Sequence, residues 1–275
     1  MTEEKQDGAD SNHKKEAPMT FLEKIFSEDL IGPWIDHGLI PQYYEFNKTG
    51  LLVMSRFAMN LFDVPWLYVT SPFDRHCSWY KHIDACHDFI PKKCMHCWKV
   101  VVMPKTLKAL FQLLSIERKM VEENPYCYCK CGIETRGDVE RNYGGYFYTN
   151  SLKEGLIRLE EVREKVYPVL GDDTTVILKR SCTEYERKYG PSNQWDNKRT
   201  EQHEIIEERL NQIFKVGYED LTNPDLMQAH TMVKWIKFAA DRGDPTIPEL
   251  NGGRRIYPGY VTYEQKSKED GNGVA

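Results

Sequence analysis

The sequence predicts an α+β fold: a ferredoxin-like β-α-β-β-α-β centre at about 76–190, with cysteine-rich metal-binding insertions and a C-terminal helical extension over 191–261. Two observations lead to this prediction. Short runs rich in β-branched and aromatic residues alternate with longer amphipathic runs in that order. In addition, 40% of the 275 residues are hydrophobic and 12% are aromatic, which is enough to fill one elaborated core.

Three further segments flank the predicted centre. Residues 1–18 and 262–275 are charged, small and polar with no apolar period, which indicates disordered tails. Residues 19–75 are predicted to wrap the centre. A short helix is predicted from Thr20 to the Gly32-Pro33 pair, followed by an irregular, aromatic-rich region to about Pro72. No run in the chain approaches eighteen consecutive apolar residues, so we expect no membrane span.

The first half of the centre begins with a β-branched run. Residues 98–103 read Trp-Lys-Val-Val-Val-Met and stop before a proline, which predicts a strand. A helix is predicted over 105–122 because apolar residues recur there at helical spacing. The second strand is predicted at 132–136. The apolar positions of the helix are Leu107, Leu110, Phe111 and Leu114.

The second half repeats the pattern. Residues 145–149, Gly-Tyr-Phe-Tyr-Thr, predict the third strand, and Ser151 with Glu154 forms a capping-box pattern that starts the next helix. A β-branched run at 174–179 predicts the fourth strand. Two more amphipathic helices are predicted downstream, and we expect them to pack as a hairpin. Their predicted ranges are 200–216 and 223–243.

Eight cysteines provide the clearest chemical signal. The predicted topology places the start of the first strand, the start of the second and the end of the fourth at one end of the sheet, so their cysteines should converge. The N-terminal residues resemble no secretory signal, which favours a reducing cytoplasm, where clustered cysteines bind metals rather than pair. The candidate ligands are Cys77, Cys86, Cys94, Cys97, Cys127, Cys129, Cys131 and Cys182.

Zinc is the predicted metal, in a structural role that fastens the strand ends to a loop over 77–97. Zinc takes four thiolate or imidazole ligands, and the cysteines exceed one such set, so their partition stays open. One alternative is an iron–sulfur or zinc-dependent enzyme with its active site at this end of the sheet. Another is an assembly protein that a zinc staple stabilises. No catalytic residue is predicted.

One sheet face is a candidate nucleic-acid surface. Tyr146 and Tyr148 alternate to the same face of the third strand, and Lys99 and Arg136 lie on neighbouring strands, a combination that can stack bases. The net charge of −5 and the pI of about 6.0 weaken that prediction. The alternative is that other segments cover the tyrosines. The predicted partner is therefore a nucleic acid or a protein.

Overall fold

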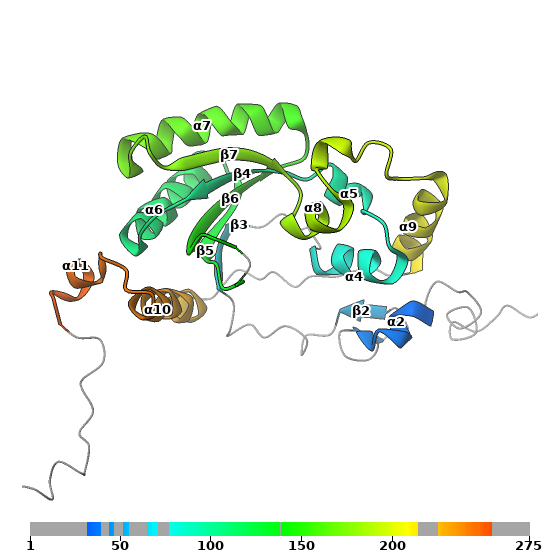
Figure 1. The fold of residues 1–275 in the computed structure, drawn as a ribbon, viewed down its shortest axis with the longest axis horizontal. Helices are drawn as coiled ribbons and strands as arrows, with labels where there is room; N and C mark the ends of the chain where they lie inside the picture. Colours follow the sequence, from blue (N-terminus) through cyan, green and yellow to red (C-terminus); the bar gives the residue numbers. More distant parts are fainter. Residues whose placement is uncertain are drawn as a thin grey trace, which may run out of the picture.

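The computed structural model describes residues 32–39, 44–46, 52–54, 65–70, 77–137, 139–213 and 225–254. The two predicted tails lie outside these residues. The described part mixes helices with a five-stranded antiparallel sheet, which confirms the α+β class (Figure 1). No helix in this part is long and apolar enough to cross a membrane.

The strands of the sheet lie in the order β3-β5-β6-β4-β7, and each pairs antiparallel with its neighbours. Trp98 lies opposite both Thr149 and Arg180, and Tyr128 lies opposite Tyr148. The starts of β4 and β5 and the ends of β6 and β7 therefore share one end of the sheet, here named the cysteine end. The strands are β3 (Trp66–Thr70), β4 (Trp98–Met103), β5 (Tyr128–Ile133), β6 (Tyr143–Thr149) and β7 (Thr175–Arg180).

Two of the strand predictions need correction. The second strand was predicted at 132–136, but β5 starts earlier, because the alternating cysteines at its start are buried against the helices. The predicted helix from Thr20 lies almost wholly outside the described residues. The region after it, to about Pro72, is predicted to be irregular, yet β3 lies within it and pairs with β5 at the sheet edge. Its sequence, Trp-Leu-Tyr-Val-Thr, carries the β-branched and aromatic residues that favour a strand.

Two long helices, α6 (Leu107–Glu123) and α7 (Leu152–Leu170), cover one face of the sheet (Figure 1). The predicted cap of α7 is present, because the Ser151 hydroxyl accepts a hydrogen bond from the Glu154 backbone N–H at 3.2 Å. Leucines of α6 and valines of α7 pack on the inward side chains of β4 and β6. This apolar layer is the main core. Cysteines on the face of the sheet that α6 and α7 cover are therefore enclosed.

Four helical segments gather at the cysteine end (Figure 1). Residues 77–97, predicted as a loop, instead contain α4 and α5, because Trp79, Tyr80 and Ile83 give an apolar helix face. The buried Leu210 of α9 packs with these residues. The segments are α4 (Cys77–His87), α5 (Lys92–Met95), α8 (Thr183–Tyr189) and α9 (Glu201–Ile213).

The predicted hairpin between the last two long helices is wrong. The helix α10 (Asp225–Asp241) inserts Trp235 into the main core beside Phe111, whereas α9 joins the separate cluster around Trp79. Figure 1 shows these two helices at opposite ends of the molecule. The remaining short elements are α2 (Gly32–Asp36), β1 (Tyr44–Phe46), β2 (Leu52–Met54), η2 (Ser192–Gln194) and α11 (Ile247–Asn251).

Candidate functional site

The cysteines at the cysteine end divide between the two faces of the sheet. Side chains alternate along a strand, so Cys127, Cys129 and Cys131 share the helix-covered face and are buried there. Cys77, Cys97 and Cys182, here named the outer-face cysteines, lie beside Lys99 and Tyr148, which leave the sheet on the opposite face. Cys94 packs beside Cys182 in the apolar cluster around Tyr185, and it also borders the cluster around Trp79, which includes Cys86.

The sequence analysis missed Glu117, which lies on α6 above the buried cysteines. Its exposed fraction is 0%, and neither carboxylate oxygen has a hydrogen-bond partner of good geometry. Burial raises the pKa of Glu117 well above its ordinary value, although a weak hydrogen bond from the Cys131 thiol acts in the opposite direction. We name Glu117, Cys127, Cys129 and Cys131 the core-face group.

A glycine makes room for this carboxyl group. Gly145 lies directly opposite Cys131 in the β5–β6 pair. A Cβ atom at Gly145 would lie 2.4 Å from Leu113 Cδ2 and 3.2 Å from Glu117 Oε1. The absence of a side chain there allows α6 to bring Glu117 close to the sheet beside Cys131.

The electrostatics of the core-face group differ from one thiol to the next. A hydrogen bond with Cys129 lowers the pKa of Cys127, and Arg158 lowers it further. The Arg158 Nη1 donates to Cys127 Sγ at 3.4 Å and also pairs with Glu161 at 2.8 Å. The same hydrogen bond and burial raise the pKa of Cys129, and burial together with Glu117 raises that of Cys131.

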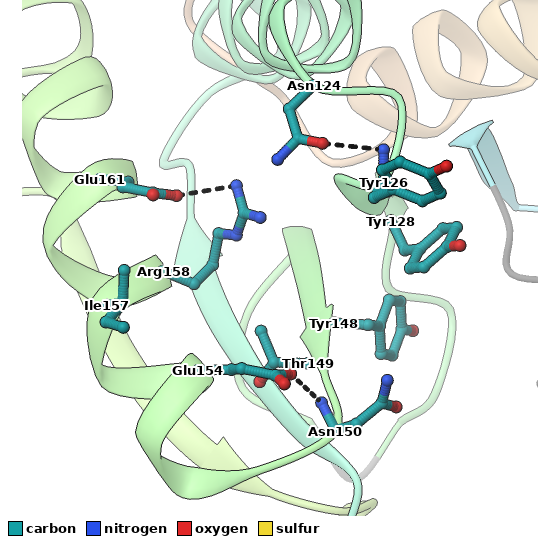
Figure 2. Close-up of a pocket in the computed structure, with 10 residues that line it drawn as sticks. All are labelled: Asn124, Tyr126, Tyr128, Tyr148, Thr149, Asn150, Glu154, Ile157, Arg158 and Glu161. Atoms are coloured by element: carbon teal, nitrogen blue, oxygen red, sulfur yellow. Dashed lines mark hydrogen bonds and ion pairs between the residues drawn. The ribbon is translucent and has the colours of Figure 1, made fainter.

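A cavity of about 410 Å³ lies next to this group. Figure 2 shows Tyr126, Tyr128 and Tyr148 along one wall and residues of α7 along the other. Tyr126 is 78% exposed, so the cavity borders solvent. Arg158 lines the cavity and also reaches Cys127, so a small ion in the cavity would be one side chain away from the buried thiols.

The described residues contain no three His, Cys, Asp or Glu side chains already placed around a common point as an ion requires. No family model, curated protein or solved structure matches the chain. The functional argument therefore depends on the local chemistry of the two cysteine groups. Of these, only the core-face group contains a buried polar group without a partner of good geometry among its own side chains.

On the outer face, a lysine accompanies the thiols. Lys99 is 7% exposed, and its Nζ donates to Cys182 Sγ at 3.5 Å. Burial and the Glu184 carboxylate tend to raise the pKa of Cys182, but the ammonium groups of Lys99, Lys81 and Lys130 outweigh them and lower the pKa. Cys182 therefore has more thiolate character than an ordinary cysteine.

The residues of the candidate nucleic-acid surface are already engaged within the protein. Tyr146 is 5% exposed, its hydroxyl accepts a hydrogen bond from Arg141 at 2.5 Å, and Trp66 packs edge-on against its ring. Arg136 pairs with Glu134 at 2.6 Å and with Glu184 at 3.0 Å. Tyr146 is therefore covered in this arrangement, whereas Tyr148 is half-buried, and a nucleic-acid surface on this face stays a prediction.

Proposed function

We propose that the protein binds a structural zinc ion through the core-face group, with Cys127, Cys129, Cys131 and Glu117 as ligands. One observation carries this proposal. Glu117 is a fully buried carboxyl group with no hydrogen-bond partner of good geometry, and it lies among three buried thiols. An orphaned buried polar group of this kind costs about 1–3 kcal/mol, and a cation would remove that cost.

The donor set suits zinc chemically. Zinc takes four ligands in structural sites and accepts thiolate sulfur and carboxylate oxygen. Three thiolates and one carboxylate around Zn²⁺ carry a net negative charge. Two arginines partly offset it: Arg158 lies beside Cys127, and Arg118 lowers the pKa of Cys131. Because the four side chains are not yet gathered around one point, the proposal includes side-chain rotation on binding.

Iron–sulfur chemistry is the alternative for the same thiols. Such clusters are held mainly by cysteine thiolates, so the carboxylate oxygen of Glu117 supports zinc over a cluster. Metal analysis separates the two, because a cluster brings iron and acid-labile sulfide in place of zinc.

The test is metal content per chain, measured by inductively coupled plasma mass spectrometry on anaerobically purified protein. We expect about one zinc ion per chain in the wild type. Glu117→Gln and Cys129→Ser should each lose most of it, while the matched control Cys86→Ser, in a different cluster, should keep it. Full zinc retention by Glu117→Gln, which preserves side-chain volume, would contradict the assignment, and so would a wild type without metal.

A second prediction separates a metal ligand from a carboxyl group that is merely buried. In metal-free protein, Glu117→Leu should raise the free energy of unfolding by about 1–3 kcal/mol, because it removes an unpartnered polar group. Adding zinc should then raise the melting temperature of the wild type and leave that of Glu117→Leu unchanged. An equal zinc response in both proteins would exclude Glu117 as a ligand.

We also propose that β4 to β7 with α6 and α7 form a ferredoxin-like unit. The element order, the strand order β5-β6-β4-β7 and the placement of both helices on one face support this. The edge strand β3 and the helices at the cysteine end are then additions to that unit. The nucleic-acid or protein partner and the cytoplasmic location stay predictions.

A further inference from the structure

The helices α4 and α8 lie side by side, and their first residues carry thiols. Lys81 of α4 pairs with Glu184 of α8 at 3.2 Å, and further along Asp84 pairs with Lys188 at 2.9 Å. Both helices thus run in the same direction. Cys77 is the first residue of α4 and Cys182 directly precedes α8, so this register brings the two thiols to the same end of the helix pair.

The sheet contributes a buried cation to the same place. Lys99 projects from β4, is almost fully buried and donates to Cys182 Sγ at 3.5 Å. A buried ammonium group is costly unless an anion accompanies it. The thiolate form of Cys182 supplies that anion, and the Cys182 and Cys97 thiols together raise the pKa of Lys99 against the effect of its burial.

The backbone that positions Cys182 is strained. Ser181 has a φ of 53°, a left-handed conformation that side chains disfavour, and its buried hydroxyl has no hydrogen-bond partner. The Ser181 N–H donates to the Cys97 carbonyl at 2.7 Å, which fixes the corner at the end of β7. Strain of this kind persists where the surrounding structure imposes it, often at functional sites.

We propose that Cys182 is a nucleophilic cysteine that reduces a small hydroperoxide, with Cys77 as the resolving thiol. The Cys182 thiolate attacks the terminal peroxide oxygen, the O–O bond breaks, and the protonated leaving group departs as water or an alcohol, which leaves a sulfenic acid. The Cys77 thiol then attacks the Cys182 sulfur and releases water, which forms a disulfide. A dithiol reductant restores both thiols and is itself oxidised to a disulfide.

Three thiols lie near Cys182. Cys94 and Cys97 are only partly exposed, and the Cys94 S–H donates to the Tyr185 hydroxyl at 3.6 Å. Cys77 fits the resolving role better, because it begins the helix beside Cys182 and its residue is exposed to solvent. Burial of its sulfur, followed by the Cys182 thiol, raises the pKa of Cys77, so it stays protonated while Cys182 ionises. Cys86 provides an internal reference, because burial alone raises the pKa of its thiol to about 12.

The first test compares cysteines within one wild-type protein. Reduced protein is treated with hydrogen peroxide, and the sites of oxidation are mapped by peptide mass spectrometry. We expect a Cys77–Cys182 disulfide, and in Cys77→Ser a sulfenic acid at Cys182 that dimedone traps. Oxidation of Cys182 no faster than Cys86 would overturn the proposal, and a disulfide from Cys182 to another cysteine would overturn the role of Cys77.

A second test addresses Lys99. We expect Lys99→Met to slow alkylation of Cys182 by iodoacetamide at least tenfold, and Lys99→Arg to retain most of the rate because it keeps the charge. Circular dichroism checks that both variants fold. Equal rates in the wild type and a folded Lys99→Met would remove the lysine from the mechanism. Zinc content is measured on the same samples. A change in alkylation rate without a change in zinc content then concerns Cys182 and not the proposed zinc site in the core-face group.

Discussion

Gly132→Ala should detach β3 from the sheet. A Cβ atom at this position would lie 2.2 Å from the Pro65 carbonyl oxygen and 2.9 Å from Trp66 Cα. Both are backbone atoms, so neither can turn aside as the end of a side chain would. The same Pro65 oxygen accepts hydrogen bonds from the Ile133 N–H at 3.2 Å and from Trp235 Nε1 at 2.9 Å, so moving it disturbs three elements.

We expect Gly132→Ala to lower the free energy of unfolding by about 3 kcal/mol, the upper part of the range for overpacking. Urea denaturation measures this. Gly137→Ala is the matched control, because a Cβ atom there meets nothing within 4 Å. If the two variants unfold at the same urea concentration, the close approach of β3 to β5 is not as the structure describes it.

Asp244→Ala should destabilise the fold by a comparable amount, because this buried carboxylate joins three parts of the chain. Its Oδ2 accepts from the Leu107 backbone N–H at 2.8 Å and from the Tyr143 hydroxyl at 2.5 Å. Its Oδ1 accepts from the backbone N–H and the hydroxyl of Thr246 at 2.9 and 2.6 Å. Truncation leaves the start of α6 and a buried phenol without their acceptor, at a cost of about 3 kcal/mol.

The effect of this substitution should depend on pH. Burial tends to raise the pKa of Asp244, but the hydrogen bonds from Thr246, Tyr143 and Leu107 outweigh it and hold the pKa below its ordinary value. A carboxyl pKa that is lower in the folded state contributes stability above the unfolded pKa of about 3.9 and loses it as the pH falls through the folded value. The gap between wild type and Asp244→Ala should therefore be full at pH 7 and narrow in acid.

Urea denaturation at several pH values measures that gap, and the exposed Asp241→Ala serves as the control. The wild type and Asp244→Ala carry the same titratable groups apart from residue 244, so the difference between their free energies of unfolding isolates the contribution of Asp244. A gap that is constant from pH 7 into strong acid would show that the carboxylate charge does not contribute.

The sequence predicted the central elements well where a local pattern determines them. The strand at 98–103 is a continuous β-branched run and lies where predicted, and Ser151 caps its helix because that interaction involves neighbouring residues. The strand β3 was missed because its partner, β5, lies about sixty residues away. An amphipathic pattern shows that α9 and α10 each bury one face, but it does not show which element each face packs against. The predicted hairpin was wrong for that reason.

The candidate sites were predictable only in part. Topology correctly predicted which cysteines share an end of the sheet. The period of two along β5 also predicts that its cysteines share a face, but which face the helices cover depends on the whole fold. Glu117 carried a local signal, since it interrupts the apolar stripe of α6 between Leu113 and Met120. That its carboxylate has no hydrogen-bond partner of good geometry is visible only in three dimensions.

The strand order also bears on the sequence of events during folding. Among the paired strands of the five-stranded sheet, only β5 and β6 follow one another in the chain, whereas β4 must meet β7 across a connection of about seventy residues. Closing a longer loop costs more entropy, and long-range pairings slow folding. We therefore expect the β5–β6 hairpin to form first and the pairing of β4 with β7 later. Cys97 and Cys182 flank β4 and β7, so these two thiols would come together only after the strand that carries Cys129 and Cys131 has found its partner.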